Sequence, residues 1–67
     1  MNKDEWSKVK EFVKSHIGES AHTNWIQPIE LKEINGSVAK FKVPTRFIGT
    51  WVHRNYGDHI IQGFKNQ

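Results

Sequence analysis

The sequence predicts an α+β domain in which two N-terminal helices are followed by a β-hairpin and a long C-terminal helix. Apolar residues recur at spacings of three and four within residues 2–17 and again within residues 45–64. Between these segments, residues 29–43 alternate apolar and polar side chains around Asn35-Gly36, the strongest short hairpin signal. Because two strands alone are only marginally stable, we expect the hairpin to lay its apolar face on the helices.

The first predicted helix has recognisable ends. Asn2 is suited to cap its N-terminus, with Glu5 placed to complete a capping box, and Gly18 is suited to end it with a left-handed backbone. Trp6 lies in the first turn, and it is either a core residue or an exposed self-association site. One face of the helix carries the apolar residues Val9, Phe12, Val13 and Ile17.

The second predicted helix is short, spans residues 20–26 and is closed by Pro28. We expect Ala21 and His22, in its first turn, to be exposed. Trp25 is expected to be buried, because so short a helix needs a core contact to be stable.

The last predicted helix begins after Pro44, with Thr45 as its N-cap. Ile48 begins an apolar row along it, whereas Phe47 lies off that row and is expected to be exposed. Gly57-Asp58 could break the helix, but we expect it to continue or to kink, since the row continues beyond these residues. The residues expected to be largely buried are Trp25, Leu31, Phe41, Trp51, Val52 and Tyr56.

Length and composition indicate a small binding domain. The 67 residues suffice for one domain, 1–67, and include three Trp, four Phe and one Tyr but no cysteine, which excludes disulfides and fits a cytoplasmic setting. No run approaches the ~20 apolar residues that span a bilayer, so we expect no membrane association. The formal charge of +3 permits contact with nucleic acid or an acidic partner.

Catalytic and metal-binding patterns do not emerge. No two of the four histidines have the i, i+4 spacing of a helical metal site, and the chain has neither a P-loop nor a dinucleotide fingerprint. We therefore expect no enzyme activity, no metal and no cofactor. The histidines are His16, His22, His53 and His59.

Single-stranded nucleic acid is an alternative ligand. Phe47 is available for base stacking beside a basic patch, the combination that single-strand binders use. The G-x-x-G loop with which KH modules clamp a nucleic-acid backbone is absent from the sequence. The predicted basic patch comprises Lys40, Lys42, Arg46 and Arg54.

Several short motifs together resemble a known family. They are W-x5-F from Trp6, N-W-I-x-P from Asn24, the Asn35-Gly36 hairpin, and V-P-T-R-F-I-x-x-W-V-x-x-x-Y from Val43. As a set, covering residues 6 to about 64, they resemble the N-terminal domain (domain I) of the bacterial chromosomal replication initiator DnaA.

The resemblance implies a KH-like compact fold and an interaction module of replication initiation. Such domains self-associate, contact the replicative helicase, receive regulators of initiation and bind single-stranded DNA weakly. By position, Trp6 matches the self-association residue and Phe47 the aromatic implicated in helicase contact. Thr45 falls where the family can have an Asn used by regulators and single-stranded DNA, and Arg46 lies between Thr45 and Phe47.

The sequence also departs from the family pattern. Ala21 stands where some members carry an acidic residue that helps to bind helicase, and His22 where an aromatic residue is usual. The chain ends at Gln67, where the family usually continues into a further strand. Two alternatives therefore stay open beside an initiator fragment: a free-standing regulator of the initiator with the same fold, and a weak single-stranded DNA-binding module.

Overall fold

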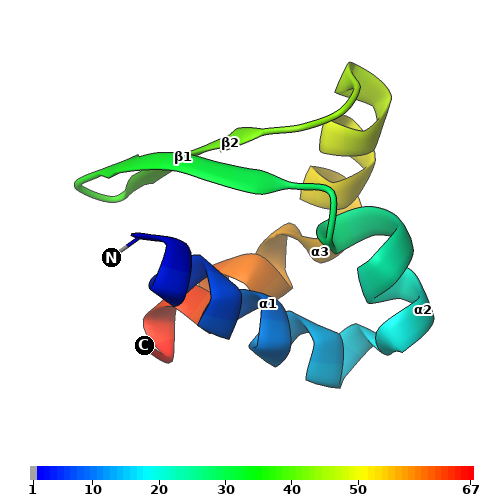
Figure 1. Ribbon diagram of the computed structural model, residues 1–67, viewed down its shortest axis with the longest axis horizontal. Coiled ribbons are helices and arrows are strands. Elements are labelled where there is room, and N and C mark those ends of the chain that lie inside the picture. Colours follow the sequence, from blue (N-terminus) through cyan, green and yellow to red (C-terminus); the bar gives the residue numbers. More distant parts are fainter. Residues whose placement is uncertain (1) are drawn as a thin grey trace.

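A computed structural model describes residues 2–67, with side chains from Asp4 onward, and confirms the predicted α+β class. Figure 1 shows the hairpin lying across the helices, with the long last helix running from the hairpin back to the first helix. The two strands form one antiparallel sheet. The elements are α1 (Asn2–Ile17), α2 (Glu19–Ala21), the π-helical turn η1 (His22–Ile26), β1 (Glu30–Asn35), β2 (Val38–Lys42) and α3 (Arg46–Lys65).

The first helix ends as predicted. Gly18 has a φ of 95°, a backbone conformation that side chains with a Cβ rarely adopt, and its N–H still bonds to the Lys14 carbonyl at 2.8 Å. The predicted capping role of Asn2 concerns a side chain outside the described ones.

The second helical segment differs from the regular helix that the sequence suggests. After one turn as α2 it widens into η1, where the Gln27 N–H reaches the His22 carbonyl, five residues back, at 2.8 Å. His22 is buried, so the prediction that it is exposed is wrong. The segment lies against α1.

The hairpin turn is one residue further along than predicted. Asn35 pairs with Val38 as the last rung of the ladder, so the two turn residues are Gly36 and Ser37. Gly36 has a φ of 58°, whereas neither Asn35 nor Ser37 has a positive φ. The hairpin predicted at Asn35-Gly36 is therefore confirmed, but its turn is not of type I′, which needs a positive φ at both central residues; a glycine at the first turn position supplies the one positive φ.

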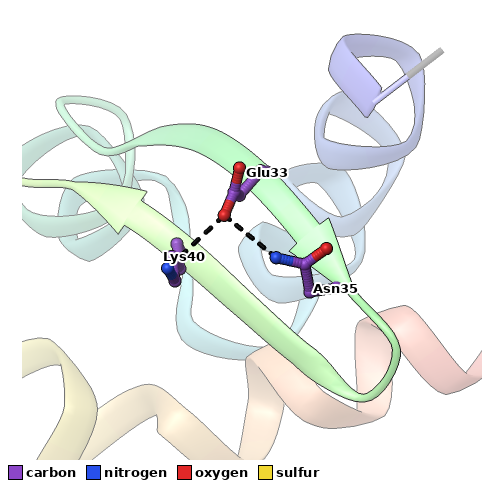
Figure 2. A network of polar contacts seen from close by, with 3 residues as sticks. All are labelled: Glu33, Asn35 and Lys40. Atoms are coloured by element: carbon purple, nitrogen blue, oxygen red, sulfur yellow. Dashed lines mark hydrogen bonds and ion pairs between the residues drawn. The ribbon is translucent and has the colours of Figure 1, made fainter.

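A bulge interrupts the alternation of β1. Leu31 pairs with Phe41, but Glu33 pairs with Lys40, so Lys32 is an extra residue on its strand. As a result Leu31 and Ile34, three residues apart, are the half-buried side chains of β1. Figure 2 shows Glu33 on the outer side of the hairpin, within reach of the side chains of Asn35 and Lys40.

The long helix α3 continues without a break from Arg46 to Lys65, as expected. Its axis bends along its length in Figure 1. Its C-terminal part packs closely on α1: a Cβ on Gly63 would lie 2.8 Å from Val9 Cγ1 and 3.3 Å from Phe12. Among the described residues, no helix is long and apolar enough to cross a membrane.

The core lies closer to α1 than predicted. Of the six residues expected to be buried, Val52 is 3% exposed, and the other five are half-buried. The buried hydrophobic residues are Trp6, Val9, Val13, Ile26, Ile29 and Val52.

Trp6 belongs to this core, which confirms the first of its two interpretations; it is not an exposed residue. It is 5% exposed, and its indole N–H donates a hydrogen bond to the Ile29 carbonyl at 3.0 Å. Its ring lies 4.9 Å from that of Phe41 and 6.1 Å from that of Phe64. The first turn of α1 runs beneath the hairpin, and the indole fills the space between them.

A candidate aromatic interaction surface

The start of α3 is fixed by a side-chain cap. Thr45 has an extended backbone, and its hydroxyl oxygen accepts the Ile48 N–H at 3.1 Å, which confirms the predicted N-cap. The same first turn approaches the end of the hairpin closely, since a Cβ on Gly49 would lie 3.1 Å from Val43. The cap and this contact together orient the next residues of the helix.

Phe47 points into solvent from that first turn. It is 65% exposed, the most exposed of the large hydrophobic residues in the described chain, and this confirms the predicted exposure. Its neighbour Ile48 is half-buried and packs against the core. Adjacent residues on a helix differ by ~100° in direction, which accounts for the contrast.

Two tryptophans extend the apolar surface around Phe47. The Trp25 ring of η1 stacks on Trp51 of α3, with centroids 4.2 Å apart and planes 5° from parallel. The Phe47 ring lies 6.3 Å from Trp25. Trp25, Phe47 and Trp51 therefore form one partly exposed cluster, here called the aromatic surface.

The sequence predicts that Trp25 and Trp51 lie in the core, and it does not predict this surface. A usable signal was present, because Phe47 and Trp51 are four residues apart and lie on the same side of a helix. Trp51 also shares the apolar row that begins at Ile48, and membership of that row predicts a place in the core. The stack on Trp25 depends on the position of η1, which spacing along α3 does not reveal.

The remaining predicted partner-binding residues do not form a single patch with Phe47. Thr45 and Arg46 are exposed beside it, while Ala21, which was predicted to be exposed, is half-buried at the end of α2. His22 is withdrawn from the surface, and its Nε2 has no hydrogen-bond partner among the described residues. Burial, and then the charges of Lys10 and Lys14, lower the pKa of His22 below its ordinary value of 6.5.

The predicted basic residues divide between two elements. Lys40 and Lys42 are exposed on β2, and Lys40 forms an ion pair with Glu33 at 3.4 Å (Figure 2). Arg46 and Arg54 are exposed on α3, separated by about 12 Å along the helix axis. Of the four predicted basic residues, Lys42, Arg46 and Arg54 thus have no ion pair with a described residue.

The described residues contain no cluster of three or more His, Cys, Asp or Glu side chains placed to hold a metal ion. His16 and His59 approach each other, with ring centroids 5.6 Å apart, and this contact joins α1 to α3. The arrangement at the start of α3 is thus an exposed aromatic site flanked by polar and cationic side chains.

Comparison with known proteins identifies the family. A model of the DnaA N-terminal domain matches residues 3–66. Chromosomal replication initiator proteins DnaA from Cereibacter sphaeroides and Ruegeria sp. are 40% identical over 60 residues and 38% identical over 64, covering 90% and 96% of this chain. The DnaA of Roseobacter denitrificans is 33% identical over 67 residues, all of this chain.

These matches cover a small part of each relative. The chain spans 13% of the Cereibacter protein, 14% of the Ruegeria protein and 15% of the Roseobacter protein. No solved structure matches the chain significantly. The family model nevertheless covers nearly every residue, and the chain belongs to the DnaA N-terminal domain family.

Proposed function

We propose that this chain is a non-catalytic protein-interaction module of bacterial replication initiation, with the aromatic surface as its docking site for the replicative helicase. Its relatives are named chromosomal replication initiator proteins, which places the proposal in that process. Regulators of initiation are the second class of partner, and they would meet the same surface through Thr45 and Arg46. The proposal covers both an initiator fragment and a free-standing regulator of the same fold.

The exposure of Phe47 carries the proposal. Leaving a Phe side chain in water forgoes burial worth about 1.5–3 kcal/mol, so the position is poorly explained by folding alone. Trp25 and Trp51 beside it are rigid rings with few rotamers to lose on binding, the kind of residue that dominates interface hot spots. Thr45 holds the turn that presents Phe47, so the site is preorganised.

Self-association through Trp6 is not part of this proposal. The indole is enclosed and hydrogen-bonded within the core, and a partner could reach it only if the hairpin moved. Self-association itself stays a prediction from the family resemblance.

Titration of the replicative helicase with the wild-type domain and with Phe47→Ala tests the proposal. We expect the variant to keep its unfolding free energy within about 1 kcal/mol, because the ring is mostly in water. We expect its affinity for helicase to fall by more than about tenfold, as at an interface hot spot. Val38→Ala is the matched control, since Val38 is 56% exposed on the distant β2 and its truncation should leave both quantities unchanged.

Titrations of the domain with helicase and with single-stranded DNA, each repeated at rising salt, separate protein docking from binding to DNA. Phosphate contacts made by Lys42, Arg46 and Arg54 would weaken steeply with salt, whereas an apolar contact through Phe47 would not. Undiminished helicase binding by Phe47→Ala would contradict the proposal. A large loss of unfolding free energy in Phe47→Ala would instead show that Phe47 is a structural residue.

A further inference from the structure

Two histidine side chains from different helices lie next to each other. His16 is in the last turn of α1 and His59 is in the second half of α3, and their ring centroids are 5.6 Å apart. Within the described chain His16 is exposed and His59 is half-buried, so a small ion can reach the pair. Neither histidine has an ion pair with a described carboxylate. The pair plays no part in the function proposed above.

The backbone of α1 determines which nitrogen of His16 carries the proton. His16 Nδ1 lies 2.9 Å from the Phe12 carbonyl oxygen, which can only accept a hydrogen bond, so Nδ1 donates. The Ser15 hydroxyl, 3.2 Å from Nδ1, donates its own proton to the same carbonyl at 2.7 Å. Nε2 of the neutral ring therefore keeps its lone pair. A metal-ligating histidine usually donates its other ring N–H to a carbonyl or carboxylate in this way.

The spacing of the two rings fits a shared metal ion. With Zn–N bonds of about 2.0–2.1 Å and a tetrahedral angle at the ion, the centres of two coordinated imidazoles lie about 5.2 Å apart. The measured separation of 5.6 Å is only slightly wider. The Phe12 ring packs beside His16, with centroids 4.4 Å apart, and limits the motion of that ring. The helices themselves pack closely, since a Cβ on Gly63 would lie 2.8 Å from Val9 Cγ1, so folding alone brings the two histidines together.

We propose that His16 and His59 form a binding site for a divalent transition-metal ion, represented by Zn²⁺, that connects α1 to α3. His16 contributes Nε2, and His59 contributes one ring nitrogen. Water or other ligands take the remaining positions, so the site is weaker than a structural site closed by four protein ligands. Spacing along one helix does not predict such a pair, because its two members belong to different helices. The proposal does not depend on helicase docking.

The donor atoms select the class of ion. Neutral imidazole nitrogen suits Zn²⁺, Ni²⁺ and Cu²⁺, whereas Mg²⁺ and Ca²⁺ prefer oxygen ligands. The chain has no cysteine, so no thiolate competes for the ion. In the unfolded chain the two histidines are far apart and do not act together, so the ion binds the folded chain more tightly. Binding should therefore stabilise the domain.

Zinc titration of the untagged domain at constant pH tests the proposal. We expect one Zn²⁺ per chain by isothermal titration calorimetry, and a melting temperature that rises with Zn²⁺ concentration. Mg²⁺ at the same concentrations should leave the melting temperature unchanged, because it prefers oxygen ligands. Half an equivalent of Zn²⁺ per chain would overturn the proposal, since the ion would then be held between two copies.

Substitution of each histidine tests whether the two act together. His16→Gln and His59→Gln should each weaken Zn²⁺ binding at least about tenfold, because a single imidazole loses the effective concentration that the second one provides. His53→Gln is the matched control: His53 is exposed on α3, and its loss should leave the affinity for Zn²⁺ unchanged. Thermal unfolding of each variant without metal shows that its fold is intact.

Nitrogen-15 nuclear magnetic resonance of the wild-type imidazoles identifies the ligating atoms without any variant. Zn²⁺ should shift the His16 Nε2 resonance and leave Nδ1 protonated, because Nδ1 stays bonded to the Phe12 carbonyl. One nitrogen of His59 should shift over the same range of Zn²⁺ concentration, whereas the ring nitrogens of His22 and His53 should not. Shifts of His16 and His59 at different concentrations would show two separate ions and overturn the proposal.

The competing outcome is unspecific binding of Zn²⁺ by exposed histidines. In that case His53→Gln would weaken Zn²⁺ binding as much as His16→Gln does, and several ions would bind each chain. Either result would overturn the proposal, as would a melting temperature that does not respond to Zn²⁺. An unchanged affinity for Zn²⁺ in His59→Gln would also overturn it, because the ion would then not connect the two helices.

Discussion

The two sides of α3 differ in how closely they are packed. Towards α1 the helices approach so closely that a methyl group on Gly63 would lie 2.8 Å from Val9. Towards the hairpin, α3 leaves a groove of about 680 Å³, and the ring of Phe47 projects from its first turn. One well-packed side of α3 supplies the core, and the apolar residues on its other sides are only partly covered by the described chain.

The strongest test of this contrast compares a core residue with a residue of the aromatic surface. Ile26 is fully buried, and Ile26→Ala should cost about 3–4 kcal/mol of unfolding free energy through lost burial and a cavity. Trp51→Ala removes a larger side chain, yet it should cost only about 2 kcal/mol, from partial burial and the stack on Trp25. Urea unfolding of both variants measures the two losses, and the opposite order would show that the aromatic surface is part of the core.

A pair of glycines in α3 tests the closeness of the α1 contact. Gly63→Ala should destabilise the domain by about 1–2 kcal/mol, because overpacking against Val9 and Phe12 outweighs the better helix propensity of alanine. Gly57→Ala meets nothing nearer than His53 at 3.8 Å and should stabilise the domain by up to about 1 kcal/mol. Thermal unfolding measures both shifts, and a stabilising Gly63→Ala would mean that α1 and α3 separate easily.

The sequence predicted the elements and the exposed anchor because local rules determine them. The positive φ of Gly18 and the hydroxyl cap of Thr45 are each set by residues close in the chain. Phe47 was placed in water by helical spacing alone, and it is 65% exposed. Such features can be predicted without knowing which elements pack together.

Burial was predicted less well because it depends on how the elements pack. Trp51 is on the apolar row of α3, but the part of that row facing η1 is only half-covered, so its ring stacks on Trp25 instead of entering the core. The bulge at Lys32 and the widened turn at His22 each change which side of the element the following residues face. Strict alternation and regular helical spacing do not predict such a change. Both errors concern which side of an element a residue faces.

The smallest expected effect concerns pH and the buried His22. Burial, and then the nearby charges of Lys10 and Lys14, lower the pKa of its ring in the folded state, while Glu11 and Glu19 raise it to a lesser extent. The unfolded chain therefore takes up a proton on His22 at a higher pH than the folded chain does. The stability that the neutral ring contributes should be complete above the ordinary value of 6.5, and lost as pH falls from there towards the folded pKa.

Urea unfolding at about pH 7.5 and about pH 5 measures this loss, and His22→Phe isolates the share that belongs to His22. The variant keeps a ring of similar size where neutral imidazole now lies, so it should lose less stability on acidification than the wild type. His53→Gln is the control, because His53 is exposed on α3 and its removal should leave the pH dependence of the wild type in place. An identical loss in the wild type and in His22→Phe would show that the ring of His22 is as well solvated in the folded chain as in the unfolded one, and would place η1 further from α1 than the structure has it.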